Sequence, residues 1–240
     1  MKNVFKSIKE DFKKHKYIIK AILIFIFSYF VLDYAFSYTL YYLKVKELSG
    51  PMLVILNALK NIILLFILFL IYRKDLIRDW DKFRANVFDN LDEGIKYWFL
   101  GLVGMVASNL IINFVFKGGQ AGNEQAVQDY IKYLPWLMLI NVGFLGPMVE
   151  ELVFRKAFKD AIKNKWLFII ISGLIFGGMH VVGSYNTITD LLFIIPYSCL
   201  GFAFAAAYYN TDTIFTSITL HMIHNTILTV TSILTLLILI

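Results

Sequence analysis

Seven long apolar runs alternate with short polar connections along the chain. A helix needs about 20 such residues to cross the hydrocarbon core of a bilayer. The runs therefore predict an all-α fold, a polytopic bundle of about seven transmembrane helices, and the last run is long enough to tilt, break or supply an eighth span. They cover residues 17–43, 52–72, 97–116, 136–158, 166–182, 191–209 and 213–240.

The segment 73–93 follows a different pattern, because apolar residues recur in it at helical spacing among charges. This pattern is typical of an amphipathic helix that lies on the membrane interface. No repeat or linker divides the chain, so we expect one membrane domain, in which residues 1–134 form a scaffold and residues 135–240 carry the chemistry. The apolar residues of the predicted interfacial helix are Ile77, Trp80, Phe83, Val87 and Leu91.

Composition agrees with a membrane protein, since 59% of the 240 residues are hydrophobic and 17% are aromatic. The formal net charge of +6 does not indicate nucleic-acid binding, because the basic residues of a membrane protein mostly report orientation. Lysine and arginine are concentrated in the N-terminus and in the segments 73–93 and 156–165. We therefore expect a multi-pass protein of the cell membrane with these three segments in the cytoplasm. The first apolar run is too long for a cleaved signal peptide and should remain as a helix.

Two charges and one cysteine inside the apolar runs have structural interpretations. Asp33 and Lys60 are costly at membrane depth, which would suit a functional site, but their isolation in the sequence favours a structural ion pair or snorkelling. Cys199 is the sole cysteine, so the chain forms no internal disulfide. It has no basic neighbour in sequence to activate it as a nucleophile, which favours a small buried packing residue.

The first cluster with catalytic potential is the sequence EELVFR at residues 150–155, which follows a Gly-Pro step. Glu151 and Arg155 are four positions apart and can pair on one helix face. Glu150, rotated by about 100°, is left without a local partner, and a buried carboxylate of this kind suits general-base chemistry. The Gly-Pro step would loosen the backbone and admit water. A structural charge cluster is the competing interpretation.

Three histidines and an asparagine in the later apolar runs add to this polar set. His180 ends the sequence FGGMH, whose glycines allow a neighbouring helix to approach closely; a hydrogen-bonded interior residue is the alternative. His221 and Asn225 share a helix face and could converge on one ligand or oxyanion. His224 lies close to the same side, so the HxxH pair could also bind a metal.

The depths expected for these residues differ. With straight helices and the boundaries above, Glu150 lies near the cytoplasmic end of the fourth helix, and His180 lies nearer the outer end of the fifth. A shared site requires either that the acidic segment lies deeper, with the stretch 155–165 partly buried, or that the fifth helix begins later.

Three motifs on successive helices resemble those of the CAAX protease and bacteriocin-processing family, also called Abi or CPBP. The resemblance covers about residues 135–230, and it implies an intramembrane endopeptidase. The motifs are EExxxR (Glu150, Glu151, Arg155), FxxxH (Phe176, His180) and HxxxN (His221, Asn225).

The resemblance also implies a role for each motif residue. Glu150 would be the general base, and His180 would orient the water. His221 and Asn225 would stabilise the oxyanion. Glu151 and Arg155 would brace the helix, with His224 as a further supporting residue.

The resemblance leaves the need for a metal open. Family members are commonly described as metalloproteases, and Glu150, His180 and His221 could ligate Zn²⁺ and leave a position for water. The sequence HExxH does not occur in the chain, and we favour a reaction without a metal, in which a glutamate activates the water.

The expected partners are the lipid bilayer and a membrane-associated peptide or protein substrate. Bacterial precedents in the family are maturation of peptide pheromones and self-immunity to bacteriocins. A richness in Lys, Ile, Asn and Phe favours a low-GC bacterial source, for which prenylated substrates are less expected.

Two other function classes stay open. A non-catalytic immunity or scaffold protein could retain the motif residues, and a transporter or proton relay could use intramembrane Glu and His, although inverted repeats were not found.

Overall fold

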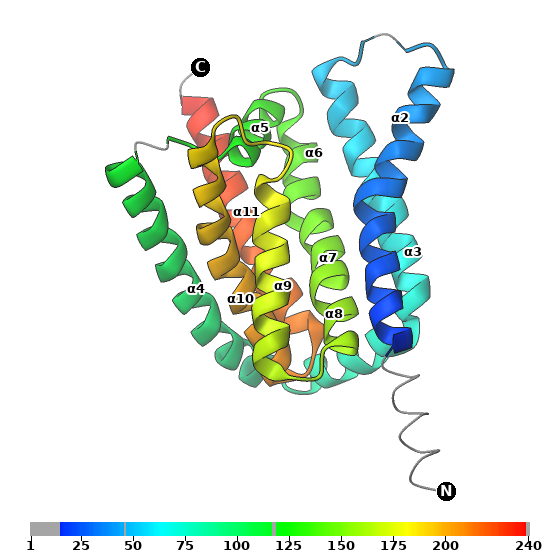
Figure 1. Cartoon of the computed structure of the whole chain (residues 1–240), viewed down its shortest axis with the longest axis vertical. Helices are drawn as coiled ribbons and strands as arrows, with labels where there is room; N and C mark the ends of the chain where they lie inside the picture. The colour runs from blue at the N-terminus through cyan, green and yellow to red at the C-terminus, as the bar shows by residue number, and fades with distance from the viewer. Residues whose placement is uncertain (1–14, 46, 117–118, 239–240) are drawn as a thin grey trace, which may run out of the picture.

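The computed structural model describes residues 15–45, 47–116 and 119–238. Within these ranges the chain forms helices and no strand, which confirms the predicted all-α fold. Six of the helices are long and apolar enough to cross a membrane, and a seventh, shorter apolar helix spans Lys165–Val181. The seven predicted runs therefore each correspond to a helix, and the chain is a helical membrane protein (Figure 1).

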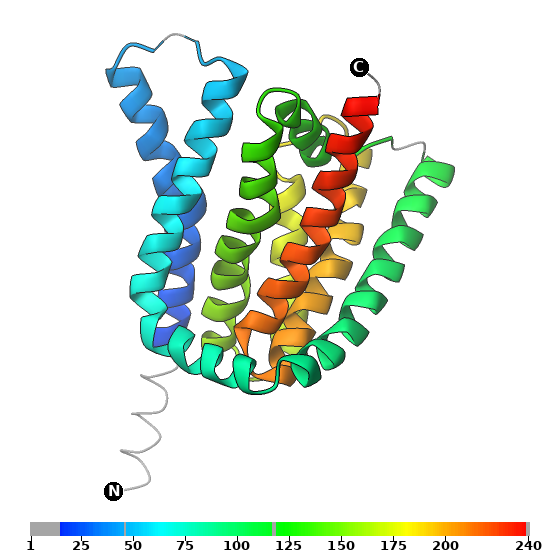
Figure 2. The same cartoon turned by 180° about the vertical axis from the view of Figure 1, so that it is seen from behind.

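The helices run up and down one bundle, with α10 between α4 and α9 and with α11 crossing behind them (Figures 1 and 2). The first described residues lie at the lower end in Figure 1, and α11 ends at the upper end. The first span, His15–Tyr42, contains η1 (Phe27–Val31) and α2 (Leu32–Tyr42). The fourth span, Pro135–Ala161, is called the fourth helix below and is distinct from α4. It is built from α6 (Pro135–Ile140), η2 (Asn141–Leu145), α7 (Gly146–Glu150), η3 (Glu151–Lys156) and α8 (Ala157–Ala161). The other elements are α3 (Gly50–Ala85), α4 (Val87–Phe116), α5 (Gly122–Ile131), α9 (Lys165–Val181), η4 (Ile188–Phe193), α10 (Ile194–Thr211) and α11 (Ile214–Ile238).

The segment 73–93 is helical, as predicted, but it is not a separate helix. It consists of the end of α3 and the start of α4, which meet at Asn86 and pass along the lower end of the bundle (Figure 2). No proline or glycine occurs between residues 52 and 85, so nothing ends α3 where the apolar run stops. Of the predicted apolar face, Phe83 is buried, whereas Ile77 and Trp80 are exposed.

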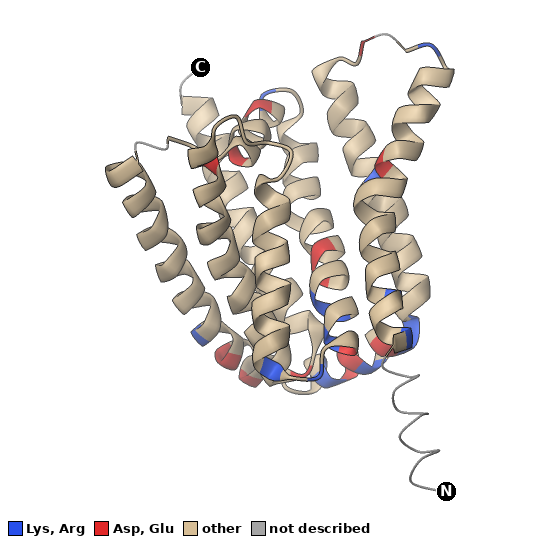
Figure 3. Ribbon diagram, in the orientation of Figure 1, with Lys and Arg blue, Asp and Glu red and all other residues tan. Residues whose placement is uncertain are grey.

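Charged residues gather at the lower end of the bundle (Figure 3). Lys156 is buried, and its Nζ lies 3.7 Å from the carboxylate of Asp79. The Thr213 hydroxyl donates to the backbone oxygen of Asp79 at 2.7 Å. These contacts attach the end of α3 to the fourth helix and to the turn before α11. The positive-inside rule predicts that this end is cytoplasmic; the basic residues of the segment 1–14 lie outside the described residues.

The isolated charges of the apolar runs pair with each other. Lys60 Nζ lies 2.6 Å from Asp33 Oδ1, which confirms the structural ion pair between the first helix and α3. Cys199 is half-buried rather than fully buried. A Cβ atom added to Gly104 of α4 would lie 3.0 Å from Cys199 Sγ, so the cysteine packs at a close helix contact.

Two glycines let α9 and α10 approach each other. A Cβ atom on Gly177 would lie 2.2 Å from Ser198 Oγ, and one on Gly201 would lie 2.8 Å from Gly173 Cα. Gly178 meets nothing within 4 Å. The close approach predicted from FGGMH is therefore due to Gly177 and not to Gly178.

The two adjacent glycines provide a matched pair of variants. Gly177→Ala should destabilise the protein by about 1–3 kcal/mol, because the added methyl overpacks the contact with α10. Gly178→Ala should leave stability equal or raise it by about 0.5–1 kcal/mol, since alanine suits a helix better than glycine. Thermal unfolding in detergent measures both, and equal losses would contradict the assigned packing.

The ion pairs of the turn between α10 and α11 should make the stability of the fold depend on pH in the acid range. Asp212 has a φ of 53° and pairs with Lys82 and, at 2.9 Å, with Lys159. Burial by itself would raise the pKa of the Asp212 carboxyl, but hydrogen bonds from Lys159 and Lys82 outweigh it and lower the pKa to about 2. Since the unfolded value is about 3.9, these pairs stabilise the fold above that pH and lose their contribution as the pH falls through about 2.

Asp212→Asn tests this pH dependence and suits the left-handed backbone. The variant should lose less than about 1 kcal/mol at pH 7, because the Asp212 side chain is 64% exposed and solvent screens its ion pairs. Its difference in thermal stability from the wild type should shrink as the pH is lowered toward about 2. A difference that stays constant between pH 7 and that value would show that the charge has no such role.

Candidate active site

The fourth helix, Pro135–Ala161, has a π-helical turn before the segment that ends at Glu150 and another that begins at Glu151. The π-helical turns η2 and η3 flank α7, which ends at Glu150; such turns often occur at functional sites. The helix continues to Ala161, and Arg155 and Lys156 are buried. Glu150 therefore lies deeper than the predicted boundary implied, as the first explanation of the depth difference requires. The second explanation is wrong, since α9 begins at Lys165.

The structure brings Glu150, His180 and His221 together. Glu150 Oε2 lies 3.9 Å from His180 Nε2 and 3.7 Å from His221 Nε2. The Glu150 side chain is 22% exposed, but its Oε2 atom is buried and has no hydrogen-bond partner among the described residues. Three polar atoms from the fourth helix, α9 and α11 thus face one another across gaps too wide for direct hydrogen bonds.

The other nitrogen of each ring determines what this gap can hold. His180 Nδ1 lies 2.9 Å from the carbonyl oxygen of Phe176, and His221 Nδ1 lies 2.9 Å from Glu151 Oε1. Because a carbonyl or carboxylate oxygen only accepts, each Nδ1 carries a proton. In a neutral ring Nε2 then presents a lone pair toward Glu150. The gap therefore needs a donor between these acceptors, and a water molecule with two O–H groups fits that requirement.

Glu151 connects the predicted brace to His221. Arg155 NH1 lies 3.2 Å from Glu151 Oε1, so the predicted Glu151–Arg155 pair is present, and both side chains are fully buried. The same carboxylate oxygen accepts from His221 Nδ1. The sequence did not indicate this Glu151–His221 contact, because 70 positions separate the two residues.

Arg155 is also held by its surroundings. Its NH2 group donates to the carbonyl oxygen of Gly201 at 3.3 Å, and its guanidinium lies 4.2 Å from the ring centroid of Phe176. Phe176 therefore has two contacts in this site, one through its ring and one through the carbonyl that fixes His180. Together with Glu151, these groups give the buried guanidinium polar and aromatic partners in place of water.

Asn225 has a partner that its sequence position did not suggest. Its Nδ2 donates to the carbonyl oxygen of Val142 at 3.1 Å, and the hydroxyl of Thr226 lies 3.5 Å from the carbonyl oxygen of Gly143. These carbonyls are five and four residues before Pro147, which has no N–H to donate to either. The side chains of α11 thus replace the hydrogen bond that proline removes from the fourth helix.

His224 lies apart from the Glu150 contacts. It is buried, and its ring centroid lies 6.3 Å from that of Trp98 in an edge-to-face arrangement. His221 instead stacks on Phe204 at 4.5 Å. The structure therefore gives the two histidines of HxxH different neighbours.

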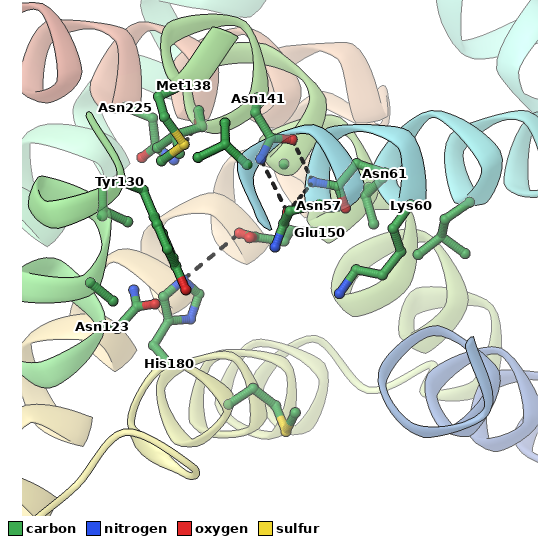
Figure 4. Close-up of a pocket in the computed structure, with 18 of the residues that line it drawn as sticks. Asn57, Lys60, Asn61, Asn123, Tyr130, Met138, Asn141, Glu150, His180 and Asn225 are labelled. Carbon is green, nitrogen blue, oxygen red and sulfur yellow. Dashed lines mark hydrogen bonds and ion pairs between the residues drawn. The ribbon is translucent and has the colours of Figure 1, made fainter. Parts of the chain in front are cut away.

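Two cavities share lining residues at this site, and Figure 4 shows the larger of the two. One has a volume of about 400 Å³ and is lined by Glu150, His180 and Asn225. The other has a volume of about 240 Å³ and is lined by His180, Asn225 and both His221 and His224. His180 and Asn225 border both cavities, so each predicted site residue except Glu151 and Arg155 lies at a space that a ligand or water could enter.

The described residues do not assemble a metal site. They contain no group of three or more His, Cys, Asp or Glu side chains placed to hold a metal ion. The predicted set of Glu150, His180 and His221 supplies ligand types that suit Zn²⁺, but its arrangement here does not fit one. Whether the protein uses a metal stays a prediction to be tested.

A protein-family model matches the part of the chain that carries the candidate site. Residues 132–227 match the family model described as "Rce1-like: Type II CAAX prenyl endopeptidase Rce1-like". The predicted resemblance is confirmed. The match contains all three motifs, and it supports a membrane protease of the CAAX type.

Curated relatives match part of the chain, and one of them is named as a membrane peptidase. "Putative membrane peptidase YdiL" of Bacillus subtilis (strain 168) is 34% identical over 136 residues, which cover 55% of this chain and 52% of that protein. "UPF0177 protein YxdF" of Lactococcus lactis subsp. lactis (strain IL1403) is 25% identical over 156 residues, which cover 62% and 78%. The chain thus spans about half the length of the Bacillus protein. No solved structure matches it.

Four asparagines in the larger cavity were not predicted, and one of them is Asn123 of α5. Asn57 and Asn61 of α3 and Asn141 of η2 line it together with Glu150. Asn57, Lys60 and Asn61 share one face of an apolar run, and this polar stripe was the signal that could have pointed to them.

The role of Asn225 in replacing the missing proline bond can be tested by stability. Asn225→Ala should lose about 1–3 kcal/mol, because it removes the donor to the Val142 carbonyl in an apolar part of the bundle. The loss should be smaller in a Pro147→Ala background, where the backbone regains an N–H. Thermal unfolding of the four proteins gives the coupling, and Asn113→Ala on the exposed face of α4 is the control. Equal losses in both backgrounds would mean that Asn225 and Pro147 act independently.

Proposed function

We propose that the chain is an intramembrane endopeptidase that hydrolyses a peptide bond of a membrane-associated protein or peptide. The observation that carries this proposal is the unpaired Glu150 Oε2, which faces the Nε2 atoms of His180 and His221 at 3.9 and 3.7 Å. A carboxylate in a cavity, opposite two imidazoles and within reach of a shared water, is suited to general-base hydrolysis. The family match supports the same activity.

In the proposed reaction a water molecule lies between Glu150 Oε2 and His180 Nε2. Glu150 takes a proton from this water as its oxygen bonds to the carbonyl carbon of the substrate, and the carbonyl oxygen becomes an oxyanion. Glu150 then gives the proton to the leaving nitrogen as the C–N bond breaks. The products are a carboxylic acid and an amine, and the carboxylate of Glu150 is regenerated.

The oxyanion would be stabilised from α11. For this role His221 must carry a proton at Nε2 as well as at Nδ1, since a ring protonated only at Nδ1 presents a lone pair at Nε2. Asn225 uses one N–H of its amide on Val142 and retains a second N–H for the substrate. Glu151 and Arg155 act in this proposal as positioning residues, through His221.

The substrate follows from the location of the site. Large apolar side chains cover the outer faces of α3 and α4, so a substrate reaches the cavities from the membrane or its interface. The family description names a prenyl endopeptidase and the Bacillus relative is named a membrane peptidase. We propose a membrane-associated peptide as the substrate. We also propose that the N-terminus of the protein and the lower end of the bundle lie in the cytoplasm.

Replacement of Glu150 is the direct test. Purified protein in liposomes is incubated with a library of fluorogenic membrane peptides. Glu150→Gln and His180→Ala should each lower kcat by at least about 10²-fold, because loss of a general base or its partner has effects of that size. Glu93→Gln, which changes an exposed carboxylate in the first two turns of α4, is the matched control and should retain activity.

Three outcomes separate the competing functions. Full cleavage by Glu150→Gln would refute the peptidase assignment. An intact cellular phenotype in that variant would favour a scaffold or immunity protein, and proton flux in liposomes that depends on a solute would favour a transporter. Cleavage assayed with and without a zinc chelator, together with metal analysis, decides whether Zn²⁺ takes part.

A further inference from the structure

The scaffold helix α3 contributes one wall of the larger cavity. Asn57, Lys60 and Asn61 line this cavity, which Glu150 and His180 also border. Figure 4 shows the asparagines of α3 beside Asn141, on the side of Glu150 away from His180. Uncharged amides are thus concentrated next to the proposed general base, although the three motifs that carry the family resemblance lie on other helices.

The three asparagines form a hydrogen-bonded cluster. Asn61 Nδ2 donates to Asn141 Oδ1 at 2.8 Å, and Asn141 Nδ2 donates to Asn57 Oδ1 at 3.1 Å. A longer contact of 3.5 Å joins Asn61 Nδ2 to Asn57 Oδ1. The cluster holds the amide planes of α3 in place relative to η2, which begins at Asn141.

The cluster leaves a donor and an acceptor unused. Among the described residues, neither Asn57 Nδ2 nor Asn61 Oδ1 has a hydrogen-bond partner. Neither atom is enclosed, since Asn57 is exposed and Asn61 Oδ1 is not among the buried atoms that have no partner. Both groups therefore border the cavity with free hydrogen-bonding capacity, and an N–H donor beside a C=O acceptor is the complement of a peptide group.

Lys60 does not compete for the same ligand. Its Nζ is paired with Asp33 at 2.6 Å, so the local charge is balanced. The wall therefore favours a neutral polar ligand over an anion. A peptide backbone in an apolar environment is such a ligand, because every N–H and C=O group that leaves a helix at membrane depth needs a new partner.

We propose that Asn57 and Asn61 bind the backbone of an extended substrate segment beside the bond that is cleaved. Asn61 Oδ1 accepts from a backbone N–H of the substrate, and Asn57 Nδ2 donates to a backbone carbonyl. Asn141 holds both amides in register. This inference rests on the proposed peptidase function, because it requires an unfolded peptide segment next to Glu150.

The test is a double-mutant cycle in which one change is made in the enzyme and the other in the substrate backbone. The probe is a fluorogenic peptide that the wild type cleaves in liposomes, compared with copies N-methylated at one backbone nitrogen on either side of the scissile bond. N-methylation removes the N–H that Asn61 would bind. At one of these positions it should raise the KM of the wild type about three- to tenfold, the effect of one hydrogen bond. Asn113→Ala should show the same increase.

The variants should respond differently to the two peptides. Asn61→Ala should show a raised KM for the parent peptide and little further increase on N-methylation, because its acceptor is already lost. Asn57→Ala should have a raised KM on both peptides, since its donor contacts a carbonyl, and kcat should change less than KM in both variants. A merely structural role would lower thermal stability and leave the N-methylation effect equal in all enzymes.

Each result decides the inference. Equal N-methylation effects in the wild type and Asn61→Ala, or no effect at any position in the wild type, would overturn it. If Asn61→Ala does not fold, a wild-type KM in Asn57→Ala overturns it instead. Glu150→Gln is measured on the same parent peptide. If it cleaves normally, the peptidase function fails; if it is inactive while the cycle is additive, the backbone site alone fails.

Discussion

The arrangement of the site depends on one buried carboxylate. Glu151 accepts from His221 and pairs with Arg155, and these contacts tie the fourth helix to α11. Arg155 in turn reaches the Gly201 carbonyl of α10 and the Phe176 ring of α9. Four helices thus converge on a group that would be costly to bury unpaired. Glu150, the next residue toward the N-terminus, is left without a partner and faces the cavity.

The fourth helix combines regular hydrogen bonding with two places where it is interrupted. The π-helical turns η2 and η3 lie on either side of α7, and Pro147 removes one backbone donor. Asn225 and Thr226 of α11 supply donors to the carbonyls before it. In an apolar environment an unpaired carbonyl is costly, so the same helix that presents His221 also stabilises the backbone that presents Glu150.

The N-terminal half is more than a support in this arrangement. The Asp33–Lys60 pair joins its first two helices, and the amides next to Lys60 form part of the larger cavity wall. At the opposite end of α3, Lys156 and Asp79 attach this helix to the fourth helix. The cavity therefore lies between α3 and the helices that carry the family motifs.

The sequence by itself determined the helical membrane fold, because runs of apolar residues have few alternatives in a bilayer. It also determined the Glu151–Arg155 pair, since residues four apart share a helix face. Contacts between helices depended on tertiary structure. Glu151 with His221, Asn225 with Val142 and the asparagine cluster of α3 join residues 70 to 84 positions apart. The spacing of residues within one helix predicts its faces, whereas helix packing decides which faces meet.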